Sequence, residues 1–275
     1  MAQSLKLKSN SLIQTFKSCR RLYELRYVYG LEYTAPIDTL ERGKSYHSKI
    51  DSLVMTGCVI SDGNLKTTAM ALAFEKYIMP YLPSMIEVTE EWIRKPIPNS
   101  DSVFVGRVDG LLSNGAIIEH KTTSGAIDEA YIDSLFYDEQ ILSYLWVKNV
   151  LDMVYCVCRT PTIRQKTGES DEAFVQRCLE WYAEDTDSKI RAIHVTRTAQ
   201  ELAEFESQLT LMAREIDSAT FFYRNQAYCT KWGRHCEYAQ VCGAYDPSVE
   251  YVNYRVRDRS QHMEEADEEK GEAPF

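Results

Sequence analysis

Three charged residues interrupt two apolar segments of the sequence. Asp109 lies in "SVFVGRVDGLL", and Glu119 and Lys121 follow in "AIIEHKTT". A buried charge is costly unless it is paired or bound to a metal ion. Two carboxylates on neighbouring strands can hold a divalent cation, which polarises a phosphoryl oxygen and lowers the pKa of bound water. Lys121 projects from the same strand face as Glu119 and can orient the water or offset charge on the phosphate. This combination is suited to phosphodiester hydrolysis.

The same three charges also have a purely structural interpretation, on a solvated face or in ion pairs. The residues around them favour the metal site, because they are the apolar residues of core strands. These neighbours are Val103, Val105, Val108, Ile117 and Ile118. We therefore expect two buried strands that carry their charges near their ends.

The elements that must position these residues follow from the spacing of apolar residues. Alternation predicts strands over 102–112 and 115–121, joined as a hairpin through the turn Ser113-Asn114-Gly115. A first helix is predicted to begin at Ser11, which has capping-box spacing to Gln14, and its apolar stripe continues to Tyr27. Further helices are predicted over 39–55, 65–79, 133–149, 171–184 and 199–224, and further strands over 86–97, 153–160 and 191–198. Strands that alternate with helices predict an α/β domain.

The bulk composition is that of an ordinary globular protein. The 275 residues are 44% hydrophobic and 26% charged, and we expect one domain over 1–258 followed by an acidic disordered tail over 259–275. No apolar run is long enough for a membrane span, and the N-terminus lacks the apolar core of a signal peptide. A cytoplasmic location is therefore expected, in the host cell if the chain is viral. The net charge of −10 does not exclude DNA, because residues 1–30 carry six basic residues and one Glu.

The order Asp109, then Glu119-His120-Lys121, resembles the motif of the PD-(D/E)XK nuclease superfamily, with Val108 in place of the motif proline. Two further features resemble its RecB-like branch, which includes stand-alone CRISPR-adaptation nucleases and RecB/AddB-type recombination nucleases. His47, in "RGKSYHSKID", matches the branch's metal-ligating histidine, and Gln140 and Tyr144 match its Q-x-x-x-Y motif. Each has a structural alternative: His47 as a helix residue without a ligand, and the Gln–Tyr pair as a partly buried helix face. Their shared order and spacing favour function.

The resemblance implies a restriction-endonuclease-like α/β core, a mixed sheet flanked by helices, with an N-terminal helical region and a C-terminal iron–sulfur clasp. It implies that His47, Asp109, Glu119 and the main-chain carbonyl of His120 hold Mn²⁺ or Mg²⁺, and that Lys121 assists the water. Gln140 and Tyr144 would support the active site and the bound strand. The expected activity is metal-dependent DNA hydrolysis, most simply as an exonuclease that prefers single-stranded ends, in end processing, recombination, repair or spacer acquisition.

Eight cysteines in a reducing compartment favour metal binding or burial over disulfides. Cys229, Cys236 and Cys242 have the spacing C-x6-C-x5-C, and Cys19 is the candidate fourth ligand. "CEYAQVC" and the segment around Cys19 resemble iron–sulfur RecB-like nucleases, which implies a 4Fe–4S cluster, although the family's usual spacing before this ending is the shorter C-x2-C. Thiolates also bind Zn²⁺, in which case His235 could replace one cysteine. The remaining cysteines, Cys58, Cys156, Cys158 and Cys178, are expected to be packed residues.

A cluster that joins the chain ends would place a set of basic residues on one surface. We expect Arg20, Arg21, Arg26, Lys231 and Arg234 to bind the DNA backbone there. The acidic C-terminus, which ends in Pro274-Phe275, resembles the tips of bacterial single-stranded-DNA-binding proteins. This tail is either a solubilising segment or a docking segment for a replication or recombination protein.

Two other functions fit parts of the pattern. The chain could be a DNA-binding or assembly subunit with a vestigial nuclease site, but the intact Asp109, Glu119 and Lys121 argue against this. It could instead be a sequence-specific endonuclease, although neither a cysteine clasp nor a Q-x-x-x-Y motif is expected there.

Overall fold

The computed structural model describes residues 6–34, 37–231, 235–243 and 253–257. The chain divides into two compact units. We name residues 37–93 and 106–205 the sheet unit, and residues 1–36, 94–105 and 206–275 the terminal unit. Strands β3 and β4 and helix α8 contribute residues to both units.

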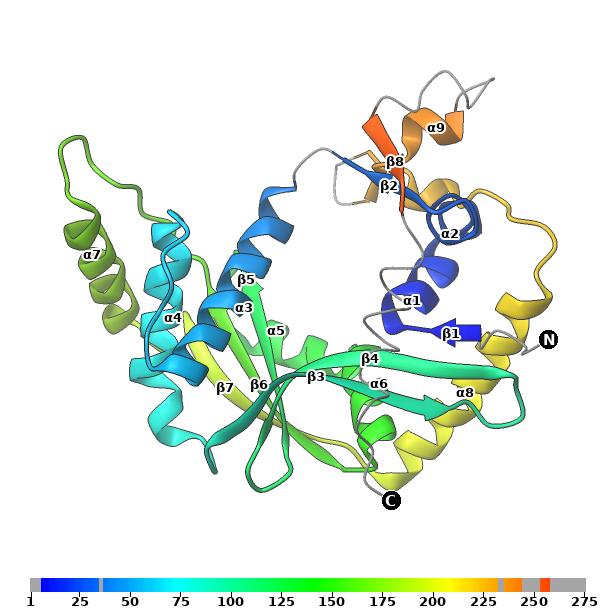
Figure 1. Ribbon diagram of the computed structural model, residues 1–275, viewed down its shortest axis with the longest axis horizontal. Helices are drawn as coiled ribbons and strands as arrows, with labels where there is room; N and C mark the ends of the chain where they lie inside the picture. The colour runs from blue at the N-terminus through cyan, green and yellow to red at the C-terminus, as the bar shows by residue number, and fades with distance from the viewer. Residues whose placement is uncertain (1–5, 35–36, 232–234, 244–252, 258–275) are drawn as a thin grey trace. The chain divides into compact units, whose positions relative to one another are not determined.

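The elements are distributed along the whole described chain (Figure 1). The strands are β1 (Lys6–Lys8), β2 (Leu31–Tyr33), β3 (Ile86–Pro96), β4 (Ser102–Leu112), β5 (Ile117–Thr123), β6 (Asp152–Arg159), β7 (Ile190–Thr196) and β8 (Tyr254–Val256). The α-helices are α1 (Asn10–Ser18), α2 (Arg20–Tyr23), α3 (Asp38–Thr56), α4 (Leu65–Tyr77), α5 (Glu129–Ser134), α6 (Glu139–Lys148), α7 (Asp171–Glu184), α8 (Ala199–Ser218) and α9 (Ala239–Gly243). A π-helical turn covers Glu24–Val28, and 3₁₀ turns cover Met79–Tyr81, Leu135–Tyr137 and Gln226–Tyr228.

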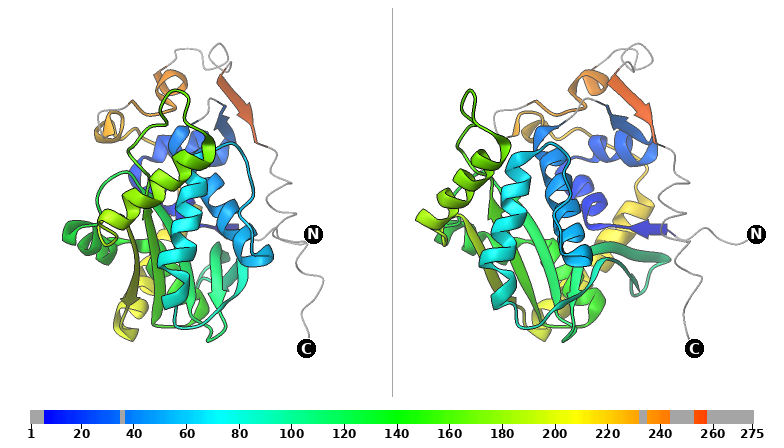
Figure 2. Two further views of the ribbon diagram at one scale, coloured as in Figure 1. Left: turned by 90° about the vertical axis from the view of Figure 1, so that its left-hand side faces the viewer. Right: turned by 60° about the vertical axis from the view of Figure 1, so that its left-hand side comes forward.

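The sheet unit is built on a mixed sheet. Strand β4 pairs with β3 and, antiparallel, with β5; β5 pairs in parallel with β6, and β6 pairs antiparallel with β7. Helices α3, α4 and α7 lie on one side of these strands (Figures 1 and 2). Their buried side chains, among them Tyr46, Phe74 and Tyr182, form one core with Ile118 and Cys156 of the sheet. The predicted mixed α/β fold is therefore confirmed.

The β4–β5 hairpin, predicted from its alternating pattern, forms as expected. Its turn needs Gly115, whose φ of 85° lies in the left-handed region that other residues rarely adopt. Gly110 is required for a different reason, because a Cβ there would meet the Val88 carbonyl oxygen at 2.8 Å and Ile118 Cγ2 at 2.9 Å. The glycine thus lets β3, β4 and β5 approach closely beside Asp109.

The terminal unit brings the two ends of the described chain together. Strand β1 pairs in parallel with the first residues of β4, and β2 pairs antiparallel with β8. A small core joins Leu22, Leu25 and Leu31 to Tyr238 and Tyr254. The Tyr238 hydroxyl donates to the Leu31 carbonyl at 2.7 Å, so the N-terminal segment is fixed to the C-terminal one.

Three predicted helices differ from those observed. The first helix is capped by Ser9, whose hydroxyl accepts from the Leu12 N–H, and not by Ser11. Its predicted course to Tyr27 is interrupted at Cys19, which is extended with φ −159° and ψ 114°. The helix predicted over 133–149 is divided into α5, a 3₁₀ turn and α6, and the one predicted over 199–224 ends at Ser218. The acidic tail over 259–275 lies outside the described residues. None of the helices in the described part of the chain is long and apolar enough to cross a membrane.

Candidate active site and cysteine cluster

Asp109 and His47 meet beside the backbone of β5. His47 projects from α3, and its Nδ1 lies 3.2 Å from Asp109 Oδ1. The other carboxylate oxygen, Oδ2, accepts the main-chain N–H of His120 at 2.7 Å. The β4–β5 register ends at the pair Gly110–Ile118, so the Asp109 side chain takes an N–H at the point where the two strands separate.

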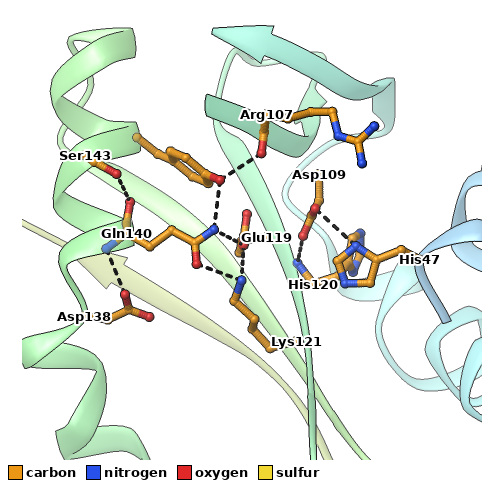
Figure 3. A network of polar contacts seen from close by, with 10 residues as sticks. His47, Arg107, Asp109, Glu119, His120, Lys121, Asp138, Gln140 and Ser143 are labelled. Atoms are coloured by element: carbon orange, nitrogen blue, oxygen red, sulfur yellow. Dashed lines mark hydrogen bonds and ion pairs between the residues drawn. The ribbon is translucent and has the colours of Figure 1, made fainter. Parts of the chain in front are cut away.

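Glu119, Lys121, Gln140 and Tyr144 form a second, adjoining network (Figure 3). Lys121 Nζ donates to Glu119 Oε1 and, at 2.9 Å, to Gln140 Oε1. Gln140 Nε2 donates to the same Glu119 oxygen at 3.1 Å and to the Tyr144 hydroxyl at 2.8 Å. The predicted Q-x-x-x-Y pair therefore contacts the predicted Glu and Lys directly.

Helix α6 fixes this network from one side of the sheet. Asp138 caps the helix by accepting the Gln140 N–H at 2.9 Å, and Asn149 ends it in the left-handed region with φ 55°. The Tyr144 hydroxyl donates to the Arg107 carbonyl of β4 at 2.8 Å. Gln140 is thus fixed through the N-cap of α6, and Tyr144 is fixed through its hydrogen bond to the main chain of β4.

His120 lies between Glu119 and Lys121 but faces the opposite side of the sheet. Its imidazole is buried edge-on against the rings of Tyr46 and Phe74. The N–H and C=O of one residue in an extended strand point to the same side of the strand. Because the His120 N–H is bound by Asp109, the His120 carbonyl also points toward β4.

The two carboxyl groups have opposite electrostatic environments. Burial alone would raise the pKa of Asp109, but the hydrogen bond and charge of His47, with further cations nearby, lower it to about 2. Burial raises the pKa of Glu119 to about 7, because the Lys121 cation offsets only part of the desolvation and Asp109 adds a like charge. Asp109 is held as a carboxylate, whereas Glu119 lacks sufficient positive charge around it.

One atom of Glu119 bears directly on metal binding. Glu119 is 2% exposed, and its Oε2 has no hydrogen-bond partner among the described residues. Buried carboxylate oxygens without a donor are uncommon in folded proteins. The donor types gathered here, two carboxylates and an imidazole, suit Mn²⁺ or Mg²⁺. The unpartnered oxygen and the raised pKa of Glu119 therefore fit a divalent cation.

The side chains predicted to bind the metal, His47, Asp109 and Glu119, are not arranged around a single point in this structure. Within the described residues, no group of three or more His, Cys, Asp or Glu side chains could hold a metal ion. Asp109 is engaged by His47, and Glu119 by Lys121 and Gln140. Protein donors engage both Asp109 oxygens and Glu119 Oε1, and leave only Glu119 Oε2 without a donor.

A small cleft opens beside Asp109. It is lined by His47, Ile50, Asp51, Thr89, Glu90, Asp109 and His120. Glu90 has a φ of 55°, a backbone conformation that costs a non-glycine residue about 1–3 kcal/mol. Such strain persists only where the surroundings impose it, and here it lies at the edge of the site.

The four predicted cysteines come together in the terminal unit. Cys19 lies at the break between α1 and α2, Cys229 follows a 3₁₀ turn, and Cys242 lies on α9. The Cys236 N–H donates to the Cys229 carbonyl at 2.8 Å. Burial raises the pKa of the Cys236 thiol, and the charges of the other three cysteines raise it further. All four thiols are free, and the other three act electrostatically on Cys236.

Hydrogen bonds join Cys19 to the C-terminal cysteine segment. The Asn225 N–H points at Cys19 Sγ at 3.4 Å, and its side-chain amide donates to the Ser18 carbonyl at 2.7 Å. N–H donors to sulfur are typical of the surroundings of bound thiolates. The remaining cysteines are packed as predicted except Cys58, which is exposed.

The predicted DNA-binding residues already have partners inside the terminal unit. Arg20 pairs with Glu215, and Arg21 pairs with Glu24. Arg26 lies over the ring of Tyr27 at 5.7 Å, and Lys231 lies over that of Tyr228 at 5.2 Å. Arg234 lies outside the described residues. Backbone binding by this set stays a prediction.

Two positioning groups of the site were not predicted. Asp138 has a sequence signal, because an aspartate two or three residues before an apolar helical run is a typical N-cap. The Arg107 carbonyl has none, since every residue carries a carbonyl and only the fold selects this one for Tyr144.

Solved structures resemble this chain to different degrees. A putative exonuclease from Eubacterium rectale is 14% identical, with 80% of this chain and 84% of that chain covered and a TM-score of 0.53. The protein SSO0001 is 15% identical, with 89% of both chains covered and a TM-score of 0.46. An alkaline exonuclease from Laribacter hongkongensis is 15% identical, with 64% and 79% covered and a TM-score of 0.35. The first of these supports a restriction-endonuclease-like fold, a mixed sheet flanked by helices.

A comparison with curated proteins finds no match. The family model described as the PD-(D/E)XK nuclease superfamily matches residues 8–243, which span both the carboxylate network and the cysteines. This family implies a nuclease that hydrolyses phosphodiester bonds in nucleic acid and typically uses a divalent metal. With a match over most of its length, the chain belongs to the PD-(D/E)XK nuclease superfamily.

Proposed function

We propose that this chain is a metal-dependent DNA nuclease that degrades single strands from their ends. The observation that carries the proposal is Glu119, buried against Lys121 and Gln140 with one oxygen unpartnered, on the strand next to Asp109. A solvated or purely structural set of charges would not leave a buried carboxylate oxygen without a donor. Of the interpretations open from the sequence, the metal site accounts for this atom.

The roles of the residues follow from their positions. His47, Asp109, Glu119 and the His120 carbonyl would hold Mn²⁺ or Mg²⁺, which when bound would polarise a phosphoryl oxygen and lower the pKa of water. Lys121 remains cationic, because burial lowers its pKa less than the neighbouring carboxylates raise it. It can therefore donate to the phosphate or to the attacking water, while Gln140 keeps its Nζ aimed beside Glu119.

The preference for single-stranded ends rests on resemblance to the RecB-like branch. His47 and the Gln140–Tyr144 pair carry that resemblance, and both contact the carboxylates. The same branch acts in end processing, recombination, repair and spacer acquisition, and one of these would be the setting of this chain. Docking of a replication or recombination protein on Pro274-Phe275 belongs to the same proposal.

We further propose that Cys19, Cys229, Cys236 and Cys242 hold a 4Fe–4S cluster, with Zn²⁺ as the alternative. Their free thiols, the electrostatic effect of the other three on Cys236 and the N–H directed at Cys19 Sγ support it. In this arrangement Arg20, Arg21, Arg26, Lys231 and Arg234 would bind the DNA backbone beside the cluster. Broad visible absorption and iron in anaerobic preparations are expected, whereas stoichiometric zinc without colour would indicate the alternative.

One assay tests the nuclease proposal. End-labelled linear and covalently circular single strands are incubated with Mn²⁺ or Mg²⁺, with and without chelator, using the wild-type chain and Asp109→Asn. We expect stepwise loss of the linear strand, no loss of the circle, and no activity with chelator or in Asp109→Asn. Cleavage of the circular strand would show that the chain is an endonuclease and not an exonuclease. Binding without cleavage would favour a DNA-binding subunit, and cleavage by Asp109→Asn would reject the site.

A further inference from the structure

The turn between α5 and α6 exposes two adjacent aromatic side chains. Phe136 is 61% exposed and Tyr137 is 79% exposed, while their neighbour Leu135 is buried. The two rings lie edge to face, with centroids 5.1 Å apart and an interplanar angle of 87°, so each presents a different plane. Single exposed apolar residues are common on protein surfaces. Two adjacent aromatic rings packed against each other on one turn are less common, and packing of the core does not require them to be exposed.

 

A buried arginine holds this turn in place. Arg197 follows β7 and is only 6% exposed. Its Nη2 donates to the carbonyls of Leu135 at 2.7 Å and Phe136 at 3.4 Å, and its guanidinium lies 5.6 Å from the centre of the Phe136 ring. Taking an arginine out of water is costly unless its donors are used. Here Nη2 fixes the main chain of the turn, while Nη1 donates to the Thr196 carbonyl and Nε has no partner among the described residues. The exposed rings are thus presented on a turn that is held from β7.

The same turn adjoins the carboxylate–lysine network. Asp138 directly follows Tyr137 and caps α6 through the Gln140 N–H, and Figure 3 shows it beside Gln140 and Lys121. The Gln140 side chain in turn contacts both Glu119 and Lys121. Tyr137 precedes Gln140 by three residues, and consecutive Cα atoms are 3.8 Å apart, so the Tyr137 Cα lies within about 11 Å of the Gln140 Cα.

The chemistry of this surface selects its occupant. A phosphate is disfavoured there, because the residue that directly follows Tyr137 is Asp138, which carries a carboxylate. Two side chains are also too few for the apolar core of a protein interface, which takes about 800 Å² from each partner. A nucleobase matches one aromatic face, is uncharged, and stacks on tyrosine or phenylalanine without regard to sequence.

We propose that Phe136 and Tyr137 form a stacking platform for an unpaired base next to the phosphodiester that is cut. This inference rests on the proposed function, because it requires a single strand to enter the Glu119–Lys121 network. The platform would hold the strand by its base, while Lys121 meets the phosphate.

The test uses single-stranded oligonucleotides that carry 2-aminopurine at one of the four terminal positions, bound to the full chain in the presence of chelator. Wild type is expected to quench the fluorescence at one position, and Tyr137→Ala is expected to abolish that quench. In cleavage assays Tyr137→Ala is expected to raise KM about 5- to 100-fold, the range for loss of one stacked base. Tyr137→Trp restores a stacking face and is expected to keep both signals.

Two controls separate stacking from other effects. Tyr81→Ala removes a tyrosine that is 81% exposed elsewhere in the sheet unit, and is expected to leave quench and KM unchanged. An abasic residue at the quenched position is expected to weaken the binding of the oligonucleotide by wild type to the level seen with Tyr137→Ala. Combining the abasic strand with Tyr137→Ala is expected to cause no further loss of binding.

The outcomes distinguish this inference from the proposed function. Quench that depends on Tyr137 in a chain that does not cut DNA would support the platform and reject the nuclease. A chain that cuts DNA with the same quench and KM in Tyr137→Ala would overturn the platform alone. An equal loss of binding for intact and abasic strands would also overturn it, because the ring would then contact something other than a base.

Discussion

The carboxylate–lysine site and the cysteine cluster are positioned by different kinds of structure. Asp109, Glu119 and Lys121 lie on strands of 11 and seven residues, and His47 lies on a helix of 19 residues. The cysteines lie at a helix break, after a 3₁₀ turn of three residues and on a helix of five residues. Long elements are held by their own ladders and by core packing, whereas short ones depend on what they contact.

The electrostatics of the two regions differ in the same way. In the carboxylate site each charged group has a protein partner, since His47 meets Asp109 and Lys121 meets Glu119. In the cysteine cluster burial raises the pKa of the Cys236 thiol, and the charges of the other three cysteines raise it further. The first region should therefore keep its shape without a ligand, while the second should depend on a bound metal.

The largest effect is expected for Cys236→Ser. A structural metal centre can contribute about 10 kcal/mol or more of folding free energy, so losing one ligand should unfold much of the terminal unit. Hydrogen exchange should show lost protection over 10–33 and 225–243 and unchanged protection in β5 and β6. Cys58→Ser, an exposed thiol of the sheet unit, is the matched control and should change nothing. Full protection in metal-free Cys236→Ser would mean that the cluster does not hold the chain ends.

Lys121→Ala should produce the opposite result, a large loss of activity with little loss of fold. Removing a group that donates to the reacting phosphate or water lowers kcat by about 100- to 10,000-fold. Lys148→Ala is the matched control on α6, where Lys148 pairs with Glu91 at 3.1 Å on the surface. Its kcat should stay within about twofold of wild type, the scale of a surface pair. Activity in Lys121→Ala comparable to that of the control would exclude Lys121 from the chemistry.

The same contrast explains how much the sequence could predict. The β4–β5 hairpin and helices α3 and α7 follow from local periodicity and turn residues, and they form as predicted. Asp109, Glu119 and Lys121 are conspicuous because charge is out of place in such strands. The sequence pattern therefore locates the carboxylate site, because the strands and helix that carry it are long enough to show a clear periodicity.

The remainder depends on contacts between distant residues. No periodic signal marks the break at Cys19, where the Cys19 N–H still bonds to the Thr15 carbonyl but the backbone becomes extended. The division of the helix predicted over 133–149 reflects the Arg197 side chain, which binds the Leu135 carbonyl from 62 residues away. The cysteine set could be chosen only through family resemblance, because spacing alone does not name Cys19 as the fourth member.

The two carboxylates should differ in how their replacement changes stability with pH. Because the pKa of Glu119 is raised to about 7, its contribution is present below its ordinary value and is lost as the pH rises through 7. In chelator, Glu119→Gln should thus become more stable than wild type by about 1–3 kcal/mol between pH 5 and 8. Urea unfolding at a series of pH values measures this difference.

Asp109→Asn is the counterpart, with the opposite sign. The pKa of Asp109 is lowered to about 2, so its contribution is present above its ordinary value and is lost as the pH falls toward 2. Asp109→Asn should be less stable than wild type by about 1–2 kcal/mol at pH 7 and equal to it near pH 2. If both variants changed stability in the same direction at pH 7, the two environments would not be opposed.

The smallest effect is expected for Tyr144→Phe, and it tests whether the carboxylate site is as rigid as the comparison requires. The change removes the donor to the Arg107 carbonyl and the acceptor for Gln140, which should cost about 0.5–1.5 kcal/mol in urea unfolding. Tyr182→Phe is the matched control. The Tyr182 hydroxyl donates to the Arg159 carbonyl at 2.5 Å, and this hydrogen bond lies outside the carboxylate site. Both variants should lose similar stability, but only Tyr144→Phe should lower kcat, by about tenfold, because Gln140 no longer holds Lys121 in one place. An equal kcat in the two variants would show that the lysine is positioned without help from α6, and that β5 alone provides the rigidity of the site.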